Sequence, residues 1–276
     1  LARHEAGAVR LAAVLALRRQ QSPLITAFLT DTDAMIARET ALAINDAPIP
    51  AAYPALAGRL GQSSDEAVQL RALNAHFRLG TAENAAALAN FAASPAQAEL
   101  RKEALALLTL WPAPPARDHI VGDFLPLDSK TRPTESVVQA LLPKLGGILT
   151  AHTPDVVQVA AIEAVHSLKL TQTGPMLGTV VADPAQSASV RVAALKVLDQ
   201  FDDAGLAVAA AAAAGSDSPE LRLAALPVSS RLAPASAVSS LTKLADQGTP
   251  KEQQIAFRAL GAAQDPAADT VILNHL

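Results

Sequence analysis

Residues 187–198 read SASVRVAALKVL, and this stretch decides the fold class. Two serines open it, and apolar residues then recur three and four positions apart, as at Val190, Ala194 and Val197. Short side-chain oxygens accept hydrogen bonds from the first amides of a helix. The apolar spacing places those side chains on one helical face. The stretch therefore predicts a capped amphipathic helix.

The same phrase recurs along the chain as an apolar residue, then Arg or Gln, then small residues and an aliphatic one. Its anchors lie 28, 33, 30, 57, 33, 31 and 32 residues apart. A period near 31 residues is typical of stacked helix pairs, because one pair cannot bury its apolar stripe alone. The anchors are Arg10, Arg38, Arg71, Arg101, Gln158, Arg191, Arg222 and Gln254.

The composition favours an all-α fold. Half of the 276 residues are hydrophobic but only 3% are aromatic, whereas a sandwich or barrel would need more aromatic and β-branched residues. We expect an α-solenoid of about eight helix pairs, with repeats over 1–110, a Pro-rich insertion over 111–134 and repeats over 135–276. The first helices of several pairs are predicted over 23–29, 52–60, 85–91, 176–181 and 237–244.

The two ends of the sequence look like halves of repeat units. Residues 4–19 read as a second helix, and residues 269–276 read as a first helix. Repeat arrays normally close with polar caps, and neither end has the composition of one. We therefore expect a segment of a longer chain.

The Pro-rich insertion contains the only tryptophan, Trp111, at the point where helical periodicity stops. Prolines at this density exclude a regular helix and favour an extended, surface-running segment. One interpretation is a loop pinned by a single buried aromatic ring. The other is a docking element for a neighbouring domain or a partner, with Trp111, Arg117 and Asp118 as candidate contact residues.

The repeated phrase resembles HEAT repeats, especially the short bacterial type called PBS-lyase-like repeats. The resemblance implies that an acidic residue near the start of the second helix pairs with a following arginine. In this sequence the pairs would be Asp33 with Arg38, Glu66 with Arg71, and Glu99 with Arg101.

The insertion carries a second resemblance. Residues 110–118 read LWPAPPARD, followed by Gly122 and by Pro126 with Leu127. This stretch is similar to the helical-repeat region of large exported bacterial proteins described as membrane-bound dehydrogenases. In that family a sorbosone-dehydrogenase-like propeller precedes the repeats and a c-type cytochrome domain follows. The resemblance implies an exported, periplasmic parent with redox activity, but it carries over no catalytic residue.

The composition and the motifs argue against several other functions. The net charge of −4 argues against a duplex nucleic-acid binder, and there is no cysteine for thiolate or haem-attachment chemistry. The longest apolar run, residues 206–214, is too short to span a bilayer. Glu163 and His166 have the spacing of a helical di-iron motif without its required partners, so a surface pair is the simpler interpretation. No serine-nucleophile elbow or phosphate-binding glycine loop appears.

We therefore expect a non-catalytic scaffold that binds a protein partner or neighbouring domains of its own chain. We expect no cofactor, no metal site, no small-molecule substrate and no nucleic-acid partner. The alternative is the repeat part of an exported haem- or quinone-dependent sugar or alcohol dehydrogenase. A bilin-binding lyase shares the repeat and ranks third, because few aromatic residues are present to stack a tetrapyrrole.

Overall fold

The computed structural model describes residues 1–127, 132–232, 234–263 and 265–275. Among these residues the secondary structure is helical, and no strand is formed beyond one isolated bridge, so the predicted all-α class is confirmed. The chain divides into two compact units. Leu1–Leu149 and Val156–Lys169 form the first, and Thr150–Asp155 and Leu170–Leu276 form the second.

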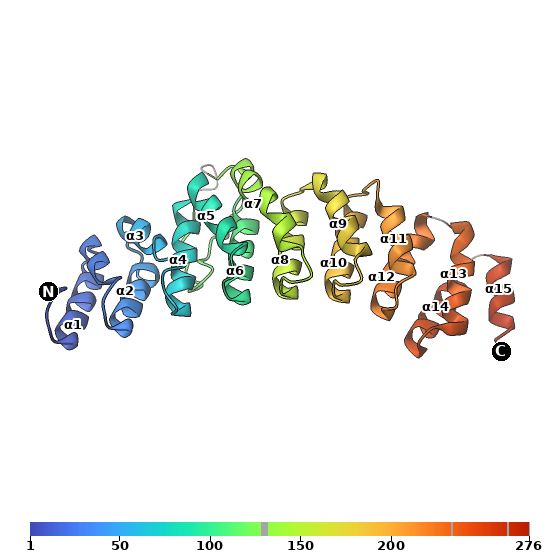
Figure 1. The fold of residues 1–276 in the computed structure, drawn as a ribbon, viewed down its shortest axis with the longest axis horizontal. Coiled ribbons are helices and arrows are strands. Elements are labelled where there is room, and N and C mark those ends of the chain that lie inside the picture. The colour runs from blue at the N-terminus through green and yellow to red at the C-terminus, as the bar shows by residue number, and fades with distance from the viewer. Residues whose placement is uncertain (128–131, 233, 264, 276) are drawn as a thin grey trace. The chain divides into compact units, whose positions relative to one another are not determined.

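The first unit contains α1 (Gly7–Arg19), η1 (Pro23–Phe28), α2 (Ala34–Asp46), η2 (Pro50–Ala52), α3 (Tyr53–Ala57), α4 (Glu66–Leu79), α5 (Ala82–Ala92), α6 (Ala98–Leu110), α7 (Thr134–Ile148) and nearly all of α8 (Asp155–Ser167). Helix α2 packs against α1 and α4, and α4 packs against α6 (Figure 1). Helix α5 contacts both α6 and α7, so neighbouring helices stay in contact across the insertion. The core between them consists of fully buried aliphatic side chains such as Val14, Ile36 and Ile44.

The second unit contains η4 (Thr171–Thr173), α9 (Gly174–Ala182), α10 (Ala188–Gln200), α11 (Leu206–Ala214), α12 (Pro219–Leu232), α13 (Pro234–Gln247), α14 (Pro250–Ala262) and α15 (Pro266–Leu273). Helices α9 and α10 pair, as do α11 and α12, and α13 and α14. Successive pairs also touch, because α9 contacts α11 and α10 contacts α12. Each helix of these first two pairs therefore packs both within its pair and against the other pair.

Two of the predicted first helices are shorter and tighter than expected. Residues 23–28 form a 3-10 helix, and residues 50–57 combine a 3-10 turn with the five-residue α3. Prolines at the start of each segment fix the backbone but remove amide donors, and α3 is followed at once by Gly58. By contrast, the apolar run 206–214 is α11 from its first residue to its last.

In α4, α6, α10 and α14, the fourth residue is a long polar side chain that bonds the end of the segment before it. Arg101 Nε donates to the carbonyl of Ala92 at 2.8 Å, and Arg191 Nε donates to that of Val181 at 2.8 Å. The last carbonyls of a helix lack partners within that helix, so this side chain satisfies one of them at the closest point of packing. Gln69 bonds the turn after α3 and Gln253 bonds α13 in the same way.

This position gives the repeat its true register. The fourth helical residue is Arg10, Gln69, Arg101, Gln158, Arg191, Arg222 and Gln253. The anchors predicted at Arg71 and Gln254 are therefore wrong by two residues and one residue. Helix α2 has Ala37 as its fourth residue, so the anchor predicted at Arg38 is wrong by one residue. The anchors were chosen by residue type along the sequence. In the structure, the first residue of each helix determines which side chain faces the preceding segment.

The acidic pairs implied by the resemblance to HEAT repeats do not form. Asp33 instead caps α2 by accepting from the amide of Met35 at 2.9 Å. Arg71 pairs with Asp46 at 3.0 Å, and Glu99 pairs with Lys102 at 3.3 Å. Arg71 reaches an acceptor in the preceding helix, α2, rather than the glutamate at the start of its own helix.

Arg191→Met tests the contribution of the fourth-position side chain to stability. Methionine keeps most of the packing but leaves the buried carbonyl of Val181 without this donor, so we expect the free energy of unfolding to fall by about 1–3 kcal/mol. The matched control is Arg231→Met, since Arg231 pairs with Asp199 on the surface of the same unit. That change should stay within about 0.5 kcal/mol. Urea unfolding followed by circular dichroism measures both, and equal effects would contradict this role.

Candidate functional site

The insertion between α6 and α7 is anchored on Trp111, whose side chain is fully buried. Its ring meets that of Phe77 edge-on, with the ring centres 6.1 Å apart. The guanidinium carbon of Arg132 lies 4.9 Å from the Trp111 ring centre and 4.7 Å from that of Phe77. A cation over two aromatic faces is held electrostatically as well as by packing. The two ends of the insertion thus meet on α4.

Arg132 passes over the end of α4 because residue 80 is a glycine. Its guanidinium donates to the carbonyl of Phe77 and, at 3.2 Å, to that of Arg78. Gly80 has φ of +71°, and a Cβ atom there would lie 2.9 Å from the guanidinium nitrogen. Any other residue would therefore be strained and would also obstruct the arginine. Burial lowers the pKa of Arg132 to about 10, so it stays charged at neutral pH.

Asp118 is heavily hydrogen-bonded within the part of the insertion that the structure describes. One carboxylate oxygen accepts from the amides of Ile120 and Val121, at 3.0 and 2.9 Å. The other accepts from Asn74 at 2.8 Å and from the guanidinium of Arg78, whose Nε lies 3.1 Å away. Because the side chains of Asp118 and Arg78 are only 2% and 5% exposed, the two opposite charges neutralise each other inside the protein.

Further polar side chains extend this pair across the first unit. Asn74 also donates to Asn45 of α2 at 2.8 Å, and Asn45 donates to Asp46 at 2.9 Å. Arg78 lies over the Tyr53 ring and donates to its hydroxyl at 3.3 Å. The insertion is therefore tied to α2, α3 and α4 by one buried network.

Burial by itself would raise the pKa of Asp118, because it penalises the charged form. The hydrogen bonds from Asn74, the Val121 amide and Arg78 outweigh that penalty and hold the pKa below its usual value. Asp118 is therefore an ionised structural anchor rather than a proton donor at neutral pH.

Residues 116–125 form a hairpin loop whose tip faces solvent. The amide of Leu125 donates to the carbonyl of Ala116 at 3.0 Å, and that of Asp118 donates to the carbonyl of Asp123 at 2.8 Å. Gly122, with φ of +75°, makes the turn, and Arg117 bonds its carbonyl at 2.9 Å. Phe124 is 69% exposed, although the loop that carries it is fixed at its base.

The three residues singled out from the sequence have different positions. Trp111 and Asp118 are buried and hold the insertion, whereas Arg117 is exposed on the hairpin loop. Phe124 was not singled out, and neither was Asn74. A polar residue within an apolar helix stripe was the available signal for Asn74. No sequence signal distinguishes Phe124 from a core aromatic.

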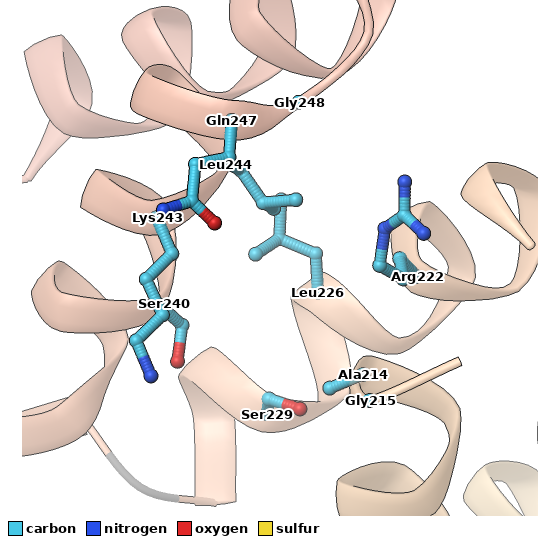
Figure 2. Close-up of a pocket in the computed structure, with 10 residues that line it drawn as sticks. All are labelled: Ala214, Gly215, Arg222, Leu226, Ser229, Ser240, Lys243, Leu244, Gln247 and Gly248. Carbon is cyan, nitrogen blue, oxygen red and sulfur yellow. The ribbon is translucent and has the colours of Figure 1, made fainter. Parts of the chain in front are cut away.

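The second unit contains a separate cavity of about 490 Å³ between α12 and α13 (Figure 2). Ser240, Lys243 and Gln247 of α13 lie along one side, and Leu226 and Ser229 of α12 lie across from them. Arg222, Leu244, Gly248 and two residues at the end of α11, Ala214 and Gly215, also line it.

Comparison with known proteins identifies no relative of this chain. No protein-family model matches it, and neither a curated protein nor a solved structure does. Within the part of the chain that the structure describes, no helix has the length and hydrophobicity to span a bilayer, and no three His, Asp or Glu side chains converge to hold a metal ion.

Asp118→Ala should be strongly destabilising, because it leaves the buried charge of Arg78 without its partner. Loss of one member of a buried pair costs about 3–5 kcal/mol. Asp123→Ala is the matched control on the same hairpin loop, where the carboxylate is exposed and only the backbone is bonded. Trp111 is the only tryptophan, so its fluorescence during urea unfolding measures both variants. A loss below about 1 kcal/mol for Asp118→Ala would contradict the role of the pair.

The lowered pKa of Asp118 also predicts a dependence of stability on pH. A carboxylate with a lowered folded-state pKa contributes stability above its unfolded pKa of about 3.9, and this is lost as pH falls further. The stability difference between the wild type and Asp118→Asn should therefore be constant from neutral pH to about 5 and shrink below about 4. Urea unfolding at several pH values measures it, and an unchanged difference at pH 3 would contradict the assignment.

Proposed function

We propose that this chain is a HEAT-like α-solenoid scaffold that docks a protein partner, or a neighbouring domain of its own parent chain, through the hairpin loop. The scaffold itself carries no catalytic residue in this proposal. Its surface area and its fixed loop do the binding.

The repeat supports the first half of the proposal. In each unit, paired helices contact the pair that follows, as α2, α4 and α6 do. The fourth-position side chain recurs at intervals of 31 to 33 residues over 69–101 and over 158–253. Helix pairs that repeat one packing rule at one period are typical of extended repeat arrays.

The observation that carries the second half is a fixed loop with an exposed aromatic side chain, Phe124, which lies opposite Arg117. The Asp118–Arg78 pair and the Arg132 stack hold the base of the hairpin loop, whereas Phe124 is 69% exposed. A loop that is already ordered loses little conformational entropy on binding. Large aromatic side chains supply much of the binding energy in protein interfaces. Phe124, with Arg117 beside it, is therefore the proposed contact.

In the alternative proposal, the docked partner is a catalytic domain of an exported haem- or quinone-dependent dehydrogenase. The residues that carry this resemblance include Trp111 and Asp118, which hold the hairpin loop in place. The repeats would then position one domain against another.

Site-specific photo-crosslinking in cells that make the natural protein tests the proposal. A photoreactive phenylalanine at position 124 should crosslink to one protein or domain, and the same group at position 24 should not. Leu24 is the matched control because it is 72% exposed in the same unit. With the purified partner, Phe124→Ala should weaken binding at least about tenfold, whereas Leu24→Ala should leave it unchanged.

Equal crosslinking at both positions, or unchanged affinity of Phe124→Ala, would contradict docking through the hairpin loop. A crosslinked propeller or cytochrome domain would favour the dehydrogenase parent over an independent partner.

A further inference from the structure

We infer that a cavity lined by α12, α13 and α14 binds an uncharged aliphatic chain that carries a hydroxyl group. This inference concerns the second unit and does not depend on the docking role of the hairpin loop. It rests on a gap in the packing of the helices, on the aliphatic wall of the cavity, and on polar lining groups that are acceptors without a cation.

The cavity lies where the second helices of neighbouring pairs separate. Helix α12 packs against α10, but it makes no comparable contact with α14. Helix α13 contacts both α12 and α14, and the three helices line a cavity of about 620 Å³. This cavity is distinct from that of Figure 2, although Leu226 lines both. Its volume lies in the range of small-molecule sites.

The wall of this cavity is aliphatic. Leu223 and Leu226 of α12, Val238 and Leu241 of α13, and Ile255 of α14 contribute branched side chains to it. Among the described residues that line it, none is aromatic, so no ring is present to stack on a planar ligand. A flexible aliphatic chain buries its apolar area in such a wall without stacking.

The polar groups of the lining are acceptors. Ser230 and Asp265 are the polar side chains, and the described lining residues include no lysine, arginine or histidine. Pro227 lies inside α12 and has no amide hydrogen, so it cannot donate to the carbonyl of Leu223 one turn earlier. Asp265 caps α15 through Oδ1, which accepts from the amide of Ala267 at 2.9 Å. A ligand can therefore gain hydrogen bonds here by donating them.

A hydroxyl group fits this lining better than a charged group does. A carboxylate offers acceptors only, and it would meet the like charge of Asp265. An ammonium group would gain little from Asp265, because that side chain is exposed and water screens its charge. It would also lose hydration against the aliphatic wall, which costs far more for a charge than for a hydroxyl.

Methyl NMR of the full chain titrated with 1-hexanol tests the inference. We expect saturable shifts at Leu223, Leu241 and Ile255, with a Kd in about the millimolar range. Ala259→Leu should weaken binding at least about fivefold, because the larger side chain takes up part of the cavity. Urea unfolding should show that this variant is no less stable than the wild type. Gln254→Leu is the matched control, since Gln254 is an exposed residue of α14 outside the lining.

Further ligands test the chemical class. Hexanoate, hexylammonium and benzyl alcohol should each bind more weakly than 1-hexanol. The inference is overturned if 1-hexanol gives no saturable shift, if any of these three ligands binds as tightly, or if Ala259→Leu and Gln254→Leu have the same effect. A dimer that 1-hexanol does not dissociate, seen by sedimentation velocity, would also overturn it, because a second copy would then cover the cavity. None of these results would bear on the crosslinking at Phe124.

Discussion

The carbonyl groups at the end of a helix must find donors, and this requirement organises the packing of the described helices. Closely packed helices leave little room for water, so a side chain has to supply the donor. Here that side chain is the fourth residue of the next helix, as Arg101 does for Ala92 and Arg191 for Val181. These bonds link α5 to α6 and α9 to α10. They also explain why a long polar residue recurs within an otherwise apolar stripe.

The Pro-rich insertion also contains buried polar groups, but other residues satisfy their hydrogen bonds. A segment with many prolines makes few backbone hydrogen bonds of its own, so other contacts must hold it. Asp118 and Arg132 provide them, and each reaches backbone or side-chain groups of α4. Buried charges are costly to desolvate and add little net stability, but they tolerate few alternative arrangements. The network therefore fixes one position of the hairpin loop more than it strengthens the unit.

The sequence predicted the all-α class, because helical periodicity is a local property. It failed where the partner of a residue lies far along the chain. Arg78 meets Asp118 across 40 residues, and Arg132 meets Phe77 across 55. The pairing of Arg71 with Asp46 rather than Glu66 has the same cause. The error in repeat register was local, since it followed from matching residue types instead of helix starts. Helix α6 ends at Leu110 and α7 begins at Thr134, and prolines lie beside both ends because they cannot continue a regular helix.

The packing of the described helices varies in two ways along the chain. In the first unit, extra residues between α6 and α7 leave the packed helices and carry an aromatic side chain to the surface. In the second unit, Arg222 has other acceptors than Arg191 while the helices keep their order, and Arg10 of α1 bonds in the same way as Arg222. Arg222 turns to the buried carboxylate of Glu252, and the space that the equivalent arginine fills beside α9 remains open beside α11. This change of acceptor needs no inserted residues and leaves the spacing of the fourth-position residues unchanged. Sequence periodicity therefore does not predict it. It appears only when the acceptor of each fourth-position side chain is known.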